Sequence, residues 1–363
     1  MRNLEPQDLT ATPVDIETFL TSPDYLGDLF KDLYPYWLDV LKEIYFDPLR
    51  SKYAEVVLAG CIGAGRSFAS LAGFLYDLYI LTLVKDPHSQ WTLIPTTPID
   101  MAISVDVAGN YYEEVVLDAL SCSPYFRSIL LPGKGKVLEE GMFPNNVGII
   151  TGSTRSFYLG RAIVGALFEC DGENNSDDSD IAHNYEYCRR RMFARFMGDD
   201  GIVPCRMWTV SSAPGLLTTF LKNHIDYMRT ALHTWVIEPA IWDVNSHKGI
   251  YCGDSFLVYA GDGDEKPRLL NEGEIGYSNY PGKVIKVPVE YRQDFEKDIY
   301  MALVELAGIP VPLAIPEQPE CEIHKETYNI FAFFDKKALR LLLVFTGFFV
   351  MFILGVLYGM LGI

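Results

Sequence analysis

The sequence is poor in basic residues relative to acidic ones. It has 30 lysines and arginines against 48 aspartates and glutamates, which gives a formal net charge of −18. A surface that coats nucleic acid must neutralise phosphates with lysine and arginine. The composition therefore argues against such a coat, although a few basic loops touching a DNA backbone remain compatible with it.

The sequence also lacks the spacings that mark metal sites and disulfide frameworks. Its seven cysteines contain no CxxC pair, and its six histidines contain no HxxxH or HExxH pattern. We therefore expect reduced thiols rather than disulfides or a zinc site, and ordinary surface or core histidines. The first nine residues have no apolar core, so we do not expect them to form a signal peptide.

What is present at the other end is a long uncharged run. Residues 341–363 contain no charged side chain, and as a helix they would extend roughly 35 Å, enough to cross a hydrocarbon core of about 30 Å. Lys336, Lys337 and Arg340 precede the run and predict a globular part in the cytoplasm. We predict a linker over 316–337 and a transmembrane helix over 338–363. A buried core helix, or a tail created by a gene truncation, are the alternatives.

The rest of the chain, 1–315, has the composition of an ordinary globular protein, with 49% hydrophobic and 21% charged residues. Apolar runs predict strands over 55–59, 102–107, 147–151, 162–168 and 207–211. Helical patterns cover 14–46 (interrupted near Pro35), 67–83, 110–120, 184–196 and 291–306. A β-rich stretch is predicted over 235–289, and the acidic segment 171–180 is predicted to be a solvated loop. Strands alternating with helices predict an α/β fold, with a mainly parallel sheet covered by helices on both faces.

A glycine-rich turn between the first strand and its helix carries the clearest chemical signal. Gly60–Ser67, GCIGAGRS, fits the phosphate-binding pattern GxxxxGK[ST] except that Arg66 replaces lysine. Such glycines let backbone N–H groups surround a phosphate, and the serine hydroxyl would ligate Mg²⁺. Arginine keeps the charge, but its planar fork cannot occupy the point that an ammonium does. The predicted ATP-binding residues are Gly60, Cys61, Ile62, Gly63, Ala64, Gly65, Arg66 and Ser67. The alternative is a plain glycine turn.

A second acid-bearing motif follows the strand 162–168. A P-loop site needs an acid there to hold Mg²⁺, often followed by a glutamate that activates water. Glu169 occupies the position of the metal-binding acid, and Cys170 that of the general base, which a thiol cannot replace. A shift in register would let Asp171 or Glu173 take the role of the base. The alternative is a core strand running into an acidic loop.

At this point the chain resembles the large terminase subunits of tailed bacteriophages, over about residues 30 to 309. The resemblance rests on the order of short motifs: Tyr34-Pro35-Tyr36-Trp37, Ser123-Pro124-Tyr125-Phe126, Phe143-Pro144-Asn145-Asn146, Gly152-Ser153, Leu159-Gly160, Arg195-Phe196, Ser211-Ser212, Val287–Asp298 and Ala307-Gly308. It implies a P-loop NTPase of the ASCE, RecA-like type. It also implies that Ser211-Ser212 senses the terminal phosphate. The family usually has lysine at Arg66, an Asp-Glu pair at Glu169-Cys170, and a C-terminal nuclease domain, for which no room is expected after Gly308.

The resemblance implies an ATPase that uses ATP and Mg²⁺ to drive double-stranded DNA into a capsid, as a homo-oligomeric ring on a portal. Metal ligation falls to Ser67 and Glu169, and catalysis to Arg66, Glu169 and Asp171. Because Arg66 and Cys170 both depart from the family pattern, hydrolysis is expected to be weak or lost. A non-catalytic, membrane-anchored nucleotide-binding scaffold is the alternative function. The run Arg189-Arg190-Arg191 with Arg195 fits a transition-state arginine, a DNA contact or a solvated basic face.

Overall fold

The computed structural model describes residues 3–50, 52–105, 109–131, 142–152, 160–170, 180–198, 200–212, 219–261, 265–271 and 283–310. All of them belong to one compact unit, Met1–Leu313. Asp171, the acidic segment up to residue 179, the predicted linker and the predicted transmembrane helix lie outside the described residues. Within the described part of the chain, no helix is long and apolar enough to cross a membrane.

The centre of the unit is a six-stranded, fully parallel sheet with the order β3-β2-β4-β5-β1-β6. Its strands are β1 (Glu55–Leu58), β2 (Ile99–Val105), β3 (Val147–Thr151), β4 (Ala162–Glu169), β5 (Met207–Val210) and β6 (Thr234–Ile237). The five strands predicted from apolar runs are confirmed, since strands buried on both faces are near-continuously hydrophobic. The edge strand β6 is only partly buried, and it falls at the start of the stretch 235–289, predicted as β-rich but not as part of this sheet.

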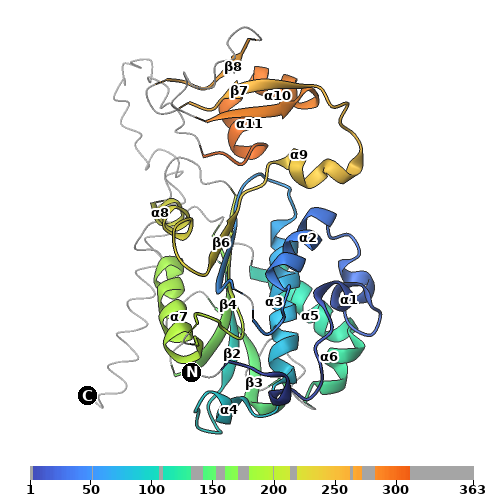
Figure 1. Cartoon of the computed structure of the whole chain (residues 1–363), viewed down its shortest axis with the longest axis vertical. Coiled ribbons are helices and arrows are strands. Elements are labelled where there is room, and N and C mark those ends of the chain that lie inside the picture. The colour runs from blue at the N-terminus through green and yellow to red at the C-terminus, as the bar shows by residue number, and fades with distance from the viewer. Residues whose placement is uncertain are drawn as a thin grey trace, which may run out of the picture. The chain divides into compact units, whose positions relative to one another are not determined.

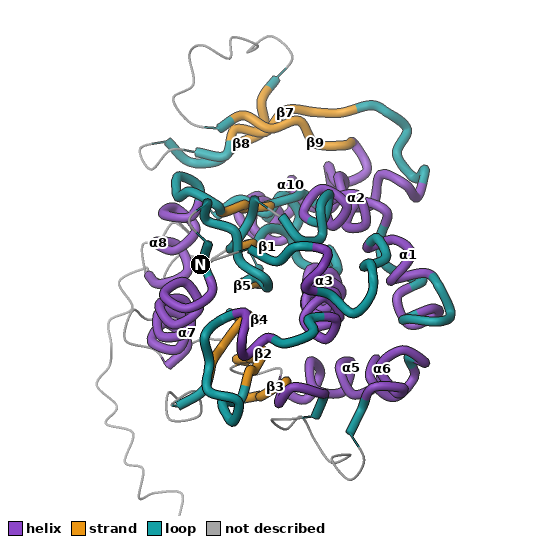
Figure 2. Tube along the Cα trace, turned by 60° about the horizontal axis from the view of Figure 1, so that its bottom comes forward, coloured by secondary structure: helices purple, strands orange, loops and turns teal. Residues whose placement is uncertain are grey.

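Helices cover both faces of this sheet, as predicted. Figure 1 shows α7 and α8 on one side and α1, α2, α3, α5 and α6 on the other, and Figure 2 shows the same division from a second direction. The helices are α1 (Ile16–Thr21), α2 (Pro35–Ile44), α3 (Arg66–Leu83), α4 (Pro87–Gln90), α5 (Gly109–Cys122), α6 (Pro124–Ile129), α7 (Asp180–Phe196), α8 (Thr219–Met228), α9 (Ile241–Val244), α10 (Arg292–Lys297) and α11 (Ile299–Glu305).

Helix α3 is fixed to the sheet by a buried polar contact as well as by packing. Asp77 on α3 is fully buried and accepts hydrogen bonds from the guanidinium of Arg206, from the backbone N–H of Arg206 (3.1 Å) and from the indole of Trp208 (3.3 Å). At Gly73, one helical turn earlier, an added Cβ would lie 2.2 Å from the Trp208 ring. The glycine therefore allows the close approach of α3 to β5, and the ion pair holds it there.

Two predicted helices are divided. The run 14–46 contains α1 and α2, and α2 begins at Pro35, whose fixed φ suits the first helical position. The prediction of one helix over 291–306 is wrong, because Asp298 is extended (φ −153°) and separates α10 from α11. The Asp298 carboxylate accepts hydrogen bonds from Tyr300 N and Met301 N at 3.1 Å, so it caps the second helix.

Helices α10 and α11 pack on a small antiparallel sheet with the order β8-β7-β9. Its strands are β7 (Ser255–Tyr259), β8 (Arg268–Leu270) and β9 (Val284–Pro288). Phe256, Val258, Val287, Phe295 and Leu303 form the centre of this second core. The β-rich prediction for this stretch is confirmed by β7, β8 and β9.

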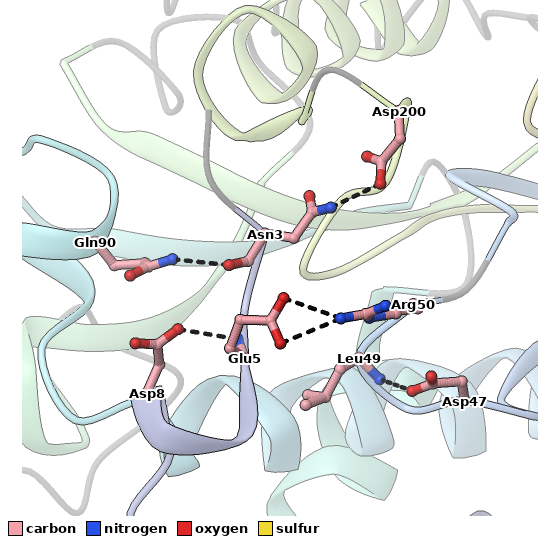
Figure 3. A network of polar contacts seen from close by, with 8 residues as sticks. All are labelled: Asn3, Glu5, Asp8, Asp47, Leu49, Arg50, Gln90 and Asp200. Carbon is pink, nitrogen blue, oxygen red and sulfur yellow. Dashed lines mark hydrogen bonds and ion pairs between the residues drawn. The ribbon is translucent and has the colours of Figure 1, made fainter.

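The N-terminal segment is tied to three distant parts of the chain (Figure 3). Asn3 donates to Asp200 at 2.7 Å, and its carbonyl accepts from the Gln90 side chain at 3.3 Å. The Arg50 guanidinium lies 2.9 Å from the Glu5 carboxylate. Leu4 is buried between these contacts, so the segment forms part of the folded unit and not a free tail.

Candidate phosphate-binding site

Three sequence motifs meet at the carboxyl ends of neighbouring parallel strands. Val210 is in register with Leu58 of β1 on one side and with Glu169 of β4 on the other. The P-loop candidate follows β1, the Ser211-Ser212 pair follows β5, and Cys170 follows β4. Ligands of open α/β sheets bind at this edge. The sequence identified the three motifs, and the parallel topology brings them together.

Three glycines of the loop have positive φ angles. Gly60, Gly63 and Gly65 have φ values of 111°, 72° and 74°, which residues with a side chain rarely adopt. A Cβ on Gly60 would lie 2.8 Å from the Pro239 carbonyl oxygen, whereas one on Gly63 would meet nothing within 4 Å. Gly60 is thus required by a close backbone contact, and Gly63 lies on the open side of the loop.

Several N–H groups of the loop are available to an anion. The N–H groups of Gly63, Ala64, Gly65, Ser67 and Phe68 donate to no protein acceptor within the described part of the chain. They lie at the start of α3, an 18-residue helix, whose N-terminus carries a partial positive charge. Unbonded N–H groups at the N-terminus of a long helix form an anion-binding site.

The first half of the loop is bonded to the protein. Cys61 N donates to Pro239 O at 3.3 Å, and Ile62 N donates to Glu305 O of α11 at 2.8 Å. A Cβ on Gly308 would lie 2.7 Å from Gly60 Cα. Cys61 and Ile62 are both among the predicted ATP-binding residues, but their N–H groups already have acceptors within the protein.

Arg66, the departure from the family pattern, joins the loop to the end of β5. Its buried guanidinium donates through Nη1 to Gly60 O (2.7 Å) and to Ser211 O, and through Nη2 to Ser212 Oγ (3.0 Å). The charge of Arg66 also acts on Cys61: burial raises the pKa of that thiol to about 11, and Arg66 opposes the rise. Arg66 therefore contacts both predicted nucleotide-binding segments.

The motif quoted around Trp37 acquires a structural role. The Trp37 indole N–H, from α2, donates to Ala64 O, and the Tyr34 ring lies 3.5 Å from where a Cβ on Gly65 would be. Both side chains brace the loop from outside. The sequence marked them as part of the resemblance but gave no indication of this contact.

At the end of β4, Glu169 is buried and accepts a hydrogen bond from the Tyr112 hydroxyl of α5 at 2.8 Å. Tyr112 was not among the predicted site residues, since a tyrosine in an amphipathic helix has no distinctive signal. Cys170 is 1% exposed, and its N–H donates to Val210 O at 2.9 Å. Asp171 lies outside the described residues, so its predicted role stays a prediction.

The residues present fit a magnesium ion that is bound mainly by its nucleotide. No group of three or more His, Cys, Asp or Glu side chains that could hold a metal occurs among the described residues. Mg²⁺ in nucleotide sites takes one or two protein oxygens and completes its shell with phosphate oxygens and water. Ser67 and Glu169 supply that number, and their role as ligands stays a prediction.

Comparison with known proteins finds similarity among solved structures alone. No family model and no curated protein matches the chain. Among solved structures, the large terminase of bacteriophage HK97 is similar over 58% of this chain and 40% of its own, with 14% identity and a TM-score of 0.39. The large terminase ATPase domain of Thermus phage P74-26 is similar over 57% of this chain and 83% of its own, with 12% identity and a TM-score of 0.35. The chain thus spans less than half of the HK97 protein.

The terminase structures match the chain weakly in sequence and in superposition, so they carry no argument about activity. What the structure itself shows is a fully parallel six-stranded sheet with helices on both faces.

Proposed function

We propose that this chain binds ATP and Mg²⁺ at Gly60–Ser67 and that it is a terminase-like ATPase whose hydrolysis is weak or lost. The observation that carries the proposal is that, among the described residues, the N–H groups of Gly63, Ala64, Gly65, Ser67 and Phe68 have no protein acceptor at the N-terminus of α3. A plain glycine turn does not require that arrangement. The adjacency of β4 and β1 to β5 supports it, because it adds Glu169 and Ser211 to the same edge.

Each residue has a defined task in this proposal. The N–H groups of Gly63, Ala64, Gly65 and Ser67 bind phosphate oxygens, and the α3 dipole favours the negative charge of the phosphate. The hydroxyl of Ser67 and the carboxylate of Glu169 hold Mg²⁺, which neutralises charge on the phosphates. Tyr112 orients Glu169 through its hydrogen bond. The side chains of Tyr112 and Glu169 are both buried, which keeps their positions fixed.

Two features argue that the site binds better than it hydrolyses. The Arg66 guanidinium donates to the Gly60 and Ser211 carbonyls, so its charge is shared with protein oxygens where a P-loop lysine would reach the terminal phosphates. Cys170 is buried and carries no carboxylate to order and deprotonate water. These features favour the second candidate function, a nucleotide-binding scaffold without turnover.

Calorimetric titration with ATP and Mg²⁺ tests binding. We expect one site whose affinity falls in Ser67→Ala and is unchanged in Ser128→Ala, a serine on the exposed surface of α6. An absence of heat at millimolar nucleotide would refute the proposal.

A steady-state ATPase assay separates the motor from the scaffold. We expect turnover close to background in the wild-type chain and higher turnover in an Arg66→Lys/Cys170→Glu double variant. Turnover in the wild-type chain that Ser67→Ala abolishes would favour the motor instead. Translocation of double-stranded DNA as a ring on a capsid portal rests on the resemblance, and its test is stimulation of this turnover by linear duplex DNA.

A further inference from the structure

The arginine run 189–191 is divided between two environments. Arg189 turns toward the sheet: its Nε donates to the buried Glu55 carboxylate at 2.9 Å, and its guanidinium lies over the Phe193 ring. Arg190, Arg191 and Arg195 face the other way and line a hollow along α7 of about 610 Å³. Arg189 therefore has a structural role, and the remaining three belong to a different surface.

This hollow, the α7 groove, is lined by one face of α7 and by the start of β4. Its described lining residues are Arg161, Ala162, Ile163, His183, Glu186, Tyr187, Arg190, Arg191, Ala194 and Arg195. Four of them are arginines, and Glu186 alone among them is acidic. In a chain with a net charge of −18, such a concentration of positive charge in one hollow focuses the field on an anion.

Two of the arginines are held in place by the protein. Arg161 donates to the buried Asp100 carboxylate at 3.2 Å. Arg191 donates through Nη1 to Arg161 O at 3.1 Å, and its guanidinium lies 4.5 Å from the centre of the Tyr187 ring. A guanidinium has five N–H donors, so this single bond leaves Arg191 further donors that point from a fixed position.

The other two arginines are exposed. The Arg190 side chain is 78% exposed and pairs with Glu186 at 3.3 Å, one turn earlier on α7. Arg195 makes no ion pair with any described residue and lies in the last turn of α7. The helix dipole also stabilises a positive charge at that position. The dipole accounts neither for Arg161, which is not on α7, nor for the hollow.

The α7 groove is separate from the phosphate-binding site. Arg161 and Ala162 lie at the start of β4, and Glu169 lies at its end, about 23 Å away at roughly 3.3 Å per residue. Arg191, bonded to the Arg161 carbonyl, lies at the same far end. This distance excludes Arg191 as a transition-state arginine for a nucleotide bound in its own chain.

We propose that the α7 groove binds a small molecule with two or more phosphate groups, independently of the P-loop. Each planar guanidinium group can donate two parallel hydrogen bonds to two oxygens of one phosphate. A hollow of 610 Å³ lies in the range of small-molecule sites, about 300–1,000 Å³. A duplex would bring its many phosphates against a strongly acidic chain, which disfavours nucleic acid as the occupant.

The test is calorimetric titration of the full chain with inorganic pyrophosphate, without Mg²⁺. The variant Arg190→Gln/Arg195→Gln removes the two exposed charges, and we expect affinity to fall about tenfold or more, the effect of losing one or two charge-assisted hydrogen bonds. Arg127→Gln is the matched control, because Arg127 is also exposed and in the last turn of a helix, α6. Gly63→Ala alters the P-loop and leaves the α7 groove unchanged, so it distinguishes pyrophosphate binding at the two sites.

The proposal predicts that the double variant loses a pyrophosphate site that Arg127→Gln and Gly63→Ala retain. It is overturned if the double variant binds like wild type, or if Arg127→Gln weakens binding equally, which would show a general charge effect. A 20-base oligonucleotide is titrated in parallel. If the double variant weakens binding of the oligonucleotide but not binding of pyrophosphate, the groove contacts nucleic acid and the proposal is overturned.

Discussion

Gly63 offers a sharp test of the phosphate-binding loop, because the fold contains a matched control for it. Gly63 (φ 72°) and Gly249 (φ 62°) both have a left-handed backbone, and an added Cβ at either meets nothing within 4 Å. Alanine at either position is strained by about 1–2 kcal/mol, the cost of the left-handed conformation for an L-residue. The two variants, Gly63→Ala and Gly249→Ala, should therefore lose a similar free energy of unfolding.

Their effects on nucleotide binding should differ. A methyl at Gly63 is carried by the residue before Ala64, whose N–H has no protein acceptor among the described residues, whereas Gly249 follows the 3-10 turn Asn245–Lys248 and is not part of the loop. Loss of one or two charge-assisted hydrogen bonds costs about 1.5–3 kcal/mol each, so affinity for ATP should fall at least tenfold in Gly63→Ala alone.

Urea unfolding gives the free energy of unfolding of each variant, and calorimetric titration gives the affinity of each variant for ATP. Equal affinities in the two variants would refute the assignment of these N–H groups to phosphate. Unequal stabilities would instead show that the strain argument is wrong.

Three further predictions concern stability. Asp77→Ala leaves the Arg206 guanidinium buried without its partner, so the free energy of unfolding should fall by about 3–5 kcal/mol. Urea unfolding measures this loss, and Asp226→Ala, which removes an exposed ion pair, is the control. Equal losses of stability in the two variants would contradict the prediction. Burial lowers the pKa of His224 to about 4, from its ordinary 6.5. The unfolded state therefore binds more protons between pH 6.5 and 4, and stability is lost as pH falls through this window, by roughly 3 kcal/mol for His224; His224→Gln should flatten the pH dependence of the melting temperature relative to wild type. Asp298→Ala removes the cap of α11 and should cost about 1 kcal/mol, whereas no change in chemical unfolding would show that the cap is dispensable.

The main sheet could be read from the sequence because its strands are short apolar runs buried on both faces. The predicted strand 162–168 differs from β4 by one residue, and Gly60–Ser67 was recognisable because a left-handed turn between strand and helix requires glycine. The edge strand β6 was harder, since Thr234 and Trp235 are only half-buried and give no continuous run. The division of 291–306 at Asp298 was missed because the apolar spacing continues across it.

The site contacts that were missed come from residues far apart in the chain. Tyr112 reaches Glu169 across 57 positions, and Arg66 reaches Ser211 across 145. No local pattern contains such pairs, because only the order of the parallel strands brings them together. The sequence indicated that Arg66 departs from lysine, but the carbonyl oxygens that it contacts became visible only in the folded chain.

The bonds from Arg66 bear on whether nucleotide could drive motion. A ligand shifts a conformational equilibrium only by its difference in affinity for the two states. The guanidinium already connects the loop at Gly60 with the end of β5 at Ser211, so a bound phosphate is not needed to hold these segments together. Nucleotide should then act as a static ligand, which raises the melting temperature roughly with the logarithm of its free concentration above the dissociation constant, without a cycle of structural states.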